Sequence, residues 1–507
     1  YAEAIPVGEA AVAAAREAGA DRVVVDGLVV LGDAYDRTGR FDEAELRHAE
    51  AVRIAGPIGA DDSAAQAAIR LVRNLAQEQS RFDEALAWAR HAEGSVARVG
   101  RGGHREAELL AAYGVVHGIR ADYPASREAF EDALAIERSI DEESLEVAGL
   151  RANLAVTLDQ LALGDDAKIE HLASIELTER LLGPNHPALA QRLLDLGYTE
   201  LTFADPEAAR GHFERALALL ANVQDDTPLT ARAFLGLGVA HSMVGEFATA
   251  EVNMREALVR FERMYGDEHP WVARAYDDLG YLERTRGRPE IAAGMHRRAL
   301  EIQIAVHGED DPETARSRLM LGEALGESGD HEAARRHFAT SAAFFEARLG
   351  PEHPMVGQVH AQLGHAEAAL DRPGKAREHF MRALAISLAA TDSVHRIDVV
   401  AMQAEVAHCE LELGRVHEAL ASSQRALAEA DELERDPSHG GAGAIAWAYF
   451  VAAEAELAAR GDRQRALGLA RASAQRLRQA GRDLPLAADV AELIESLEAR
   501  GRRTHRH

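Results

Sequence analysis

The segment PETARSRLMLGEALGESGDHEAARRHFATSAAFFEARLGPEHP occupies residues 312–354 and contains one complete unit of a pattern that fills most of the chain. Its first half contains Gly322 and runs to Gly329, and its second half contains Ala334 and Ser341, which stand seven residues apart. Glycine ends helices because it adopts a positive φ without steric cost. We therefore predict two helices separated by a turn at Gly329, with small residues in the second helix that allow the first one to approach closely.

Three columns of equivalent residues repeat this pattern along the chain. The first small residue of the second helix recurs at intervals of 41 to 47 residues, at Ala44, Ala85, Ser126, Ala167, Ala209, Ala250, Ala292, Ala334, Ala376, Ala419 and Ala466. Another small residue follows each of them seven positions later. A glycine precedes many of them by twelve positions, at Gly32, Gly114, Gly197, Gly238, Gly280, Gly322 and Gly364. One helix pair cannot bury its apolar face alone, so the columns predict an all-α solenoid of about eleven stacked helix pairs.

The spacing also includes an aromatic column and a recurring connector. One turn after the first small residue stand Phe130, Phe213, Phe338 and Phe380, which we expect to fill the space between neighbouring units. The connectors that enter the next unit are Leu182–Pro187, Tyr265–Pro270, His307–Pro312 and Leu349–Pro354. Proline is suited to the first position of a helix, where its missing N–H has no partner to lose. The connector histidines are therefore expected to fix the entry into the next helix.

This arrangement resembles the tetratricopeptide repeat. The Leu-Gly step, the turn glycine, the small residues and the Gly-x-x-His-Pro connectors are similar to the long repeat, with a period near 42 residues, of kinesin light chains and many bacterial proteins. The resemblance covers residues 23 to about 480. It implies a right-handed α-α superhelical solenoid whose first helices line a concave surface, where extended peptides or partner helices bind.

The register also predicts the boundaries of the array. Residues 1–18 are expected to form the second helix of an incomplete repeat, which suggests a fragment of a longer polypeptide. Residues 23–480 are expected to form the continuous solenoid. Residues 483–500 carry one apolar face and are interpreted as a capping helix. Residues 501–507 are expected to be a disordered tail.

Composition excludes several classes of function. The 507 residues include 84 acidic and 56 basic side chains, and the net charge of −28 disfavours binding to nucleic acid. No apolar run is long enough to insert into a membrane. The single cysteine, Cys409, excludes an internal disulfide and fits a reducing compartment, so we expect a cytoplasmic protein.

The sequence lacks the residue patterns of the common catalytic and metal sites. Phosphate-loop, dinucleotide and nucleophile-elbow motifs do not occur. His331 and His337 are six residues apart, whereas a helical pair of metal ligands needs a separation of four. His408 and Cys409 are adjacent and point about 100° apart on a helix, so they do not form a base and nucleophile pair. We therefore predict no enzyme activity, no cofactor and no metal.

Candidate binding residues lie in one column of the first helices. Arg232, Arg274 and Arg316 stand 42 residues apart, six positions before the glycine column. A line of arginines can bind carboxylates or a phosphorylated segment through bidentate hydrogen bonds. The alternative is that these arginines pair with acids of the next helix, such as Asp277 or Glu323, or face water.

Aromatic residues and acidic residues complete the candidate surface. Tyr198 and Tyr281 occupy equivalent positions and are interpreted either as flat contact surface or as core. Asp277 is included among the tentative peptide-binding residues. Asp26, Asp33 and Asp36 are expected to make the amino-terminal part of the groove acidic.

Two functions fit these observations. The first is a non-enzymatic scaffold that binds a protein or peptide, either acidic or phosphorylated, in the concave groove. The alternative is a regulatory or substrate-recruiting arm of a larger bacterial signalling enzyme, because such arrays resemble those attached to serine/threonine kinases or caspase-like peptidases. The asparagine pairs of kinesin light chains are missing here, so the cargo preferences of that family are not transferred.

Overall fold

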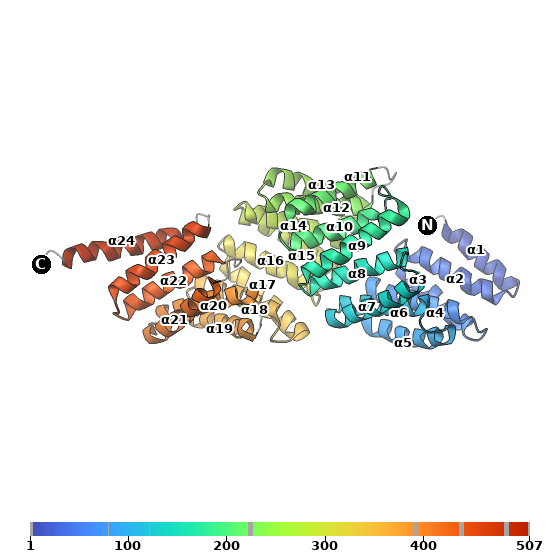
Figure 1. Ribbon diagram of the computed structural model, residues 1–507, viewed down its shortest axis with the longest axis horizontal. Helices are drawn as coiled ribbons and strands as arrows, with labels where there is room; N and C mark the ends of the chain where they lie inside the picture. Colours follow the sequence, from blue (N-terminus) through green and yellow to red (C-terminus); the bar gives the residue numbers. More distant parts are fainter. Residues whose placement is uncertain are drawn as a thin grey trace. The chain divides into compact units, whose positions relative to one another are not determined.

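A computed structural model describes residues 4–79, 81–120, 122–221, 227–389, 393–435, 441–480 and 486–504. Throughout these ranges the regular elements are helices, so the predicted all-α repeat solenoid is confirmed (Figure 1). The backbone packs as two compact units, residues 1–260 and residues 261–507. Each unit is described by itself below.

In the described parts of the chain, eleven helix pairs follow one another, as the columns predict. The first helices of the pairs are α2 (Asp21–Asp36), α4 (Asp61–Arg73), α6 (His104–Ile119), α8 (Leu145–Gln160), α10 (Leu189–Thr202), α12 (Pro228–Met243), α14 (Pro270–Thr285), α16 (Pro312–Glu327), α18 (Pro354–Ala369), α20 (Ser393–Glu412) and α22 (Ala442–Ala458). The second helices are α3 (Phe41–Ala55), α5 (Phe82–Val99), α7 (Tyr123–Ile140), α9 (Gly164–Leu182), α11 (Pro206–Leu220), α13 (Phe247–Tyr265), α15 (Pro289–His307), α17 (His331–Leu349), α19 (Pro373–Ala389), α21 (Val416–Leu433) and α23 (Arg463–Ala480). A π-helical turn, η1 (Asn74–Glu78), extends α4.

Two further helices stand outside the pairs. The first, α1 (Ala4–Glu17), lies within the segment expected to be an isolated second helix. The last, α24 (Leu486–Thr504), begins three residues after the expected start of the cap and continues past its expected end at residue 500. The helix thus continues over residues 501–504, the first residues of the expected tail. Residues 505–507 of the expected tail lie outside the described residues.

The connector histidines cap the first helices. The Nδ1 atoms of His269 and His353 accept hydrogen bonds from the backbone N–H groups of Trp271 and Met355, each at 3.2 Å. An imidazole can accept in this way only when that nitrogen is unprotonated. Burial lowers the pKa of both histidines, which favours the neutral form. The prediction that these histidines fix helix entry is confirmed, and Asp311 performs the same role with a hydrogen bond of 2.9 Å from Glu313 N–H.

The glycine column is explained by rings that lie directly against it. A Cβ atom added at Gly197 would stand 2.7 Å from the ring of Phe213, and one at Gly364 would stand 2.5 Å from the ring of Phe380. In each case the ring belongs to the residue sixteen positions later, in the second helix of the same pair. Glycine is required because any side chain there would occupy the volume of the ring. The aromatic column therefore fills the space within a helix pair as well as the space between neighbouring helix pairs.

Histidine replaces phenylalanine in this column in three of the repeats. His48, His171 and His296 are equivalent to Phe213 in register, and all three are buried. The rings of His48 and His296 lie against Gly32 and Gly280 as the phenyl rings do elsewhere. A buried imidazole is stabilised by polar partners. His48 and His296 have such a partner in Asp36 at 3.2 Å and Asp277 at 2.8 Å, whereas the nearest carboxylate oxygen to His171 Nε2 stands 3.6 Å away, on Asp159.

Candidate functional site

Successive first helices lie side by side within each unit and are joined by polar contacts. In the first unit, Tyr198 Oη of α10 donates to the backbone oxygen of Arg232 in α12 at 2.9 Å. In the second unit, Ser317 Oγ of α16 donates to Asp277 Oδ2 of α14 at 2.9 Å. We call the surface formed by the first helices of a unit its first-helix face. The predicted binding residues belong to these helices.

Arg232 lies on the first-helix face of the first unit and is mostly buried. Its Nη1 donates to Gln191 Oε1 at 3.0 Å, and its Nη2 stands 3.3 Å from Asp195 Oδ1. The guanidinium also lies 5.8 Å from the centre of the Tyr198 ring. The side chain is only 18% exposed. Gln191 and Asp195 therefore hold this arginine against the preceding first helix, and only part of it meets solvent.

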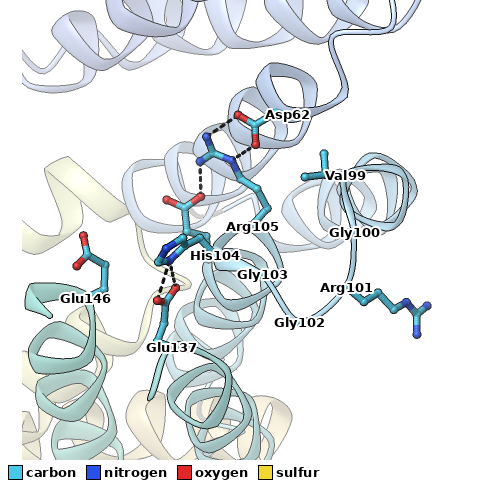
Figure 2. Close-up of a pocket in the computed structure, with 11 residues that line it drawn as sticks. Asp62, Val99, Gly100, Arg101, Gly102, Gly103, His104, Arg105, Glu137 and Glu146 are labelled. Carbon is cyan, nitrogen blue, oxygen red and sulfur yellow. Dashed lines mark hydrogen bonds and ion pairs between the residues drawn. The ribbon is translucent and has the colours of Figure 1, made fainter. Parts of the chain in front are cut away.

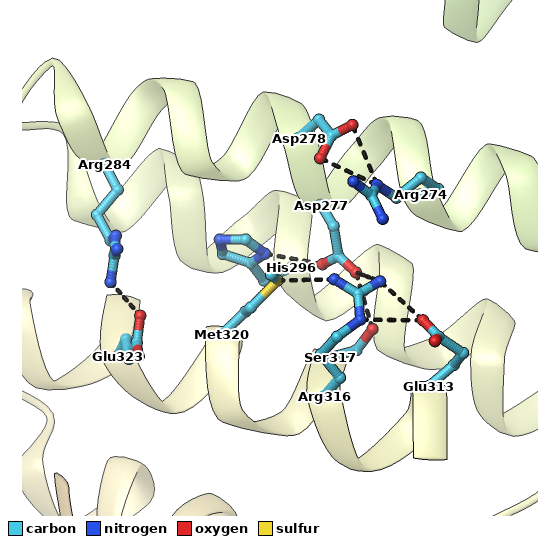
Figure 3. Close-up of polar contacts among 10 residues, drawn as sticks. All are labelled: Arg274, Asp277, Asp278, Arg284, His296, Glu313, Arg316, Ser317, Met320 and Glu323. Carbon is cyan, nitrogen blue, oxygen red and sulfur yellow. Dashed lines mark hydrogen bonds and ion pairs between the residues drawn. The ribbon is translucent and has the colours of Figure 1, made fainter. Parts of the chain in front are cut away.

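Arg274 and Arg316 lie on the first-helix face of the second unit (Figure 3). Arg274 Nε donates to both carboxylate oxygens of Asp278 at 3.2 Å, and 45% of its side chain is exposed. Arg316 is 25% exposed and donates to Glu313 Oε2 through Nη2 at 2.8 Å. Its Nη2 also stands 4.0 Å from Asp277 Oδ2. The sequence left open that the arginines of this column pair with Asp277 or Glu323. Arg316 does approach Asp277, whereas Glu323 forms an ion pair with Arg284, which is outside the column.

Asp277 is not available to a peptide. Its side chain is 0% exposed, because Oδ1 accepts from His296 Nδ1 at 2.8 Å and Oδ2 accepts from Ser317 Oγ at 2.9 Å. The expectation that Asp277 contacts a peptide directly is therefore corrected: the carboxylate is enclosed by α14, α15 and α16. The negative charge of this buried carboxylate attracts the guanidinium of Arg316 on the first-helix face.

The two tyrosines differ in their surroundings. The Tyr198 ring packs at 5.2 Å against the buried ring of Phe213, so this residue belongs largely to the core. Tyr281 is 50% exposed, and the guanidinium of Arg284 lies 5.4 Å from its ring centre. Exposed tyrosine and arginine are enriched in protein interfaces because they combine a large contact area with hydrogen-bonding groups. Tyr281 is therefore the tyrosine that can contact a partner.

Pairing changes the electrostatic character of the arginine column. Each of its three guanidinium groups has a carboxylate within 3.3 Å: Asp195 for Arg232, Asp278 for Arg274 and Glu313 for Arg316. Partly exposed ion pairs such as those of Arg274 and Arg316 contribute only about 0–1 kcal/mol, so an incoming carboxylate can share or replace these two partners at small cost. The column can therefore recognise anions through exchange of hydrogen bonds rather than through an excess of positive charge.

Sequence reasoning missed a polar cluster in the first unit, in which two partly exposed carboxylates surround the buried His48. His48 Nε2 stands 3.2 Å from Asp36 Oδ2 and 3.8 Å from Asp33 Oδ1. These three side chains lie close enough together to share a metal ion. However, Arg70 Nε lies 3.3 Å from Asp33 Oδ1, which places a positive charge beside the same carboxylates. The feature of the sequence that could have predicted this cluster is His48, which stands at a position of the aromatic column where other repeats carry phenylalanine.

A cavity of about 630 Å³ in the first unit lies beside the loop that enters α6 (Figure 2). The loop includes Gly100 and Gly102, whose φ angles of 129° and 76° require glycine. His104 Nδ1 lies 2.8 Å from Glu137 Oε2, and this hydrogen bond raises the pKa of His104. Arg105 bridges Asp62 of α4 to its own helix. The His104–Glu137 and Arg105–Asp62 pairs therefore join α6 to α7 and to α4.

Cys409 is a buried packing residue in the second unit. Burial raises the pKa of its thiol to about 12, so the reactive thiolate is disfavoured at neutral pH. The neighbouring His408 ring packs 5.1 Å from the Trp447 ring rather than against the sulfur. This arrangement agrees with the prediction that the two residues do not form a base and nucleophile pair.

Two carboxyl groups near this region are expected to make stability depend on pH. Burial raises the pKa of Glu405 and of Glu454 to about 7, assisted by the charges of Glu412 and Asp489 respectively. Between the ordinary value of 4.5 and about 7, the folded state binds more protons than the unfolded state. The free energy of unfolding should therefore fall as pH rises through this window and level off above it.

Glu405→Gln combined with Glu454→Gln should make the free energy of unfolding depend less on pH and stabilise the protein at pH 8, because neither glutamine ionises there. The gain should be only about 1–2 kcal/mol, since 35% of the Glu454 side chain is exposed and water screens part of the effect. Urea unfolding at pH 5, 6.5 and 8 measures it. Glu418→Gln, at an exposed position, is the control. Parallel pH profiles for the double variant and the wild type would contradict the assignment.

Comparison with known proteins identifies the class of fold. The model of the tetratricopeptide repeat family matches residues 142–222, 229–305, 292–347 and 327–389. The matched part of the chain, between residues 142 and 389, carries tetratricopeptide repeats, as the columns and connectors predicted. No match was found among curated proteins. Among the described residues, every helix is too short or too polar to cross a membrane.

Several solved structures are similar to the chain. A Podosopora anserina protein described as a kinesin light chain with nearly identical TPR-like repeats shares 20% identity, with 42% of this chain and 100% of that chain covered and a TM-score of 0.38. BtubC (BKLC) from P. vanneervenii shares 20% identity over 50% of this chain and 93% of its own, with a TM-score of 0.38. The apo form of RapI shares 16% identity over 70% and 99%, with a TM-score of 0.49.

Proposed function

We propose that the chain is a non-enzymatic scaffold of the cytoplasm that binds an acidic or phosphorylated peptide segment on a first-helix face. Tetratricopeptide repeats are in general protein-interaction modules, and the family match supports a protein partner. The observation that carries the proposal is the surface of α14 and α16. There the half-exposed Tyr281 stands in the same unit as the partly exposed Arg274 and Arg316.

The chemistry of this surface suits a carboxylate or phosphate group. Arginine presents several donors in a fixed plane, so one guanidinium can bind an acidic partner of its own chain and an incoming anion at the same time. Arg274 uses Nε for Asp278, and Arg316 uses Nε and Nη2 for Glu313. Tyr281, seven residues after Arg274 and therefore on the same side of α14, adds a flat apolar surface.

Selection of random twelve-residue peptides displayed on phage, followed by fluorescence anisotropy of the synthetic peptides, tests the proposal. The intact chain should enrich acidic sequences whose affinity falls as NaCl rises from 50 to 500 mM, because salt screens exposed charges. Combined Arg232→Glu, Arg274→Glu and Arg316→Glu substitutions should weaken binding by about 10- to 100-fold.

The matched control carries the same three charge reversals on second helices, at Arg215, Arg298 and Arg382. It should bind like the wild type, although its net charge is identical to that of the test variant. Equal weakening by both variants would mean that only the total charge matters. Binding that neither salt nor the test variant changes would exclude the arginine column as the site.

A further inference from the structure

A cavity on the first-helix face of the second unit is created by a local change in the repeat. It measures about 390 Å³ and lies between α18, α19 and α20. Gln358, which continues the column of Arg274 and Arg316 into α18, is one of its lining residues. The cavity therefore lies in line with the arginines of the proposed binding surface.

Three residues that line this cavity are smaller than their equivalents in the four preceding repeats. Ala361 stands where the four preceding first helices have Leu194, Leu235, Asp277 and Leu319, all of them buried, whereas α6, α8 and α20 also carry alanine at this position. Gly357 stands where the others have Ala190, Ala231, Ala273 and Ala315. Ser387 stands where the preceding second helix has the buried Phe345. Relative to the four preceding repeats, larger side chains are thus missing at three positions that line the same cavity.

The lining suits one large apolar side chain. Met355, Ile386 and Met402 supply flexible or branched apolar walls, and the thioethers of methionine adapt to partners of different shape. Gln358 and Gln362 stand among these walls with amide groups that can donate to and accept from a peptide backbone. A volume of about 390 Å³ is at the lower end of the range of ligand pockets, which favours a side chain over a larger ligand.

Charge near the cavity gives the bound segment a polarity. Arg316 lies on the neighbouring first helix and Arg274 on the one beyond it, whereas Asp398 of α20 lines the cavity itself. Neighbouring helices are about 8–10 Å apart, and an extended chain advances about 3.3 Å per residue. A peptide that crosses the first helices therefore reaches Arg316 about three residues from the cavity and Arg274 about six residues from it.

We propose that this cavity is the anchor pocket for a leucine, methionine or phenylalanine side chain of the bound segment, with an acidic residue about three positions away that binds Arg316. The proposal rests on the function proposed above and adds the specificity of the same face. The segment is neutral or basic on the side of Asp398 and acidic on the side of the arginines.

Ala361→Leu tests the pocket, since leucine is the residue that Leu235 and Leu319 supply at this position. The probes are the synthetic peptides selected on the wild-type chain. We expect them to carry a large apolar residue about three positions from an acidic one, and to bind Ala361→Leu at least 10-fold more weakly. Changing the apolar residue of the peptide to alanine should weaken wild-type binding equally, with no further loss on Ala361→Leu.

Ala369→Leu places the same side chain at the exposed end of α18 and is the control for surface hydrophobicity. Thermal unfolding of Ala361→Leu, expected at or above the wild-type midpoint, shows that the variant is folded. In one outcome, the peptides bind Ala361→Leu and the wild type equally tightly and bind the variant with three Arg→Glu substitutions more weakly. That result would overturn the proposed anchor pocket and leave the proposed function intact. Selection that enriches no peptide would overturn both proposals. A dimer of the wild-type chain that Ala361→Leu dissociates in ultracentrifugation would make the occupant a second copy instead.

Discussion

Phe213→Ala is expected to lower the free energy of unfolding of the first unit by about 3–5 kcal/mol. The ring is completely buried, and it lies against Gly197 of its own helix pair and Gly236 of the next one. Alanine would leave a cavity in contact with both pairs, and the glycines have no side chains that could move into it. The loss should therefore exceed that of a phenylalanine that contacts one surface.

Phe234→Ala is the matched control for this prediction. Phe234 is half-buried and lies beneath the guanidinium of Arg260, so its removal should cost about 1 kcal/mol. Urea unfolding followed by circular dichroism measures both variants, and hydrogen exchange in α10 to α12 locates the change. Similar losses for the two variants would show that the glycine column does not concentrate packing energy at Phe213.

Asp277→Ala is expected to lower the free energy of unfolding of the second unit by about 3–5 kcal/mol. The substitution removes the acceptor of two buried donors, His296 Nδ1 at 2.8 Å and Ser317 Oγ at 2.9 Å. Buried polar groups without partners retain the full cost of their desolvation. Asp278→Ala, one residue further on, removes only a partner of the half-exposed Arg274 and should cost less than about 1 kcal/mol.

Replacement of the whole cluster should have the opposite effect. The combined variant Asp277→Leu, His296→Phe and Ser317→Ala installs residues that equivalent positions of other repeats already carry. The ring at position 296 would lie against Gly280, as the Phe338 ring lies against Gly322. Well-packed apolar replacements of buried ion pairs are often neutral or stabilising by about 1–4 kcal/mol. A combined variant as unstable as Asp277→Ala would show that this unit depends on its polar core.

A lower affinity of the combined variant for acidic peptides, without any loss of stability, is a further expected result. Asp277 Oδ2 lies 4.0 Å from Arg316 Nη2 and helps to orient that guanidinium. Removing the carboxylate leaves Arg316 with Glu313 as its acidic partner. The buried cluster would then act as a positioning element of the binding face, measurable by the same anisotropy assay.

The sequence by itself determined the helix pairs, their number and their order. Small residues, glycines and connector prolines repeat at a constant interval, and each acts through the local backbone or through a neighbour in the same pair. The roles of Gly197 and His353 could therefore be predicted from spacing alone. The arginine column could be located in the same way, because register assigns each residue to a helix.

Tertiary structure decided what each of these side chains contacts. Asp277 meets His296 nineteen residues away and Ser317 forty residues away, and these contacts bury a carboxylate that the pattern placed on the surface. Arg232 finds Asp195 on the preceding first helix for the same reason. Helical periodicity specifies the face of a helix, whereas burial, pairing and the cavity beside Ala361 depend on how neighbouring pairs stack, which the period does not encode.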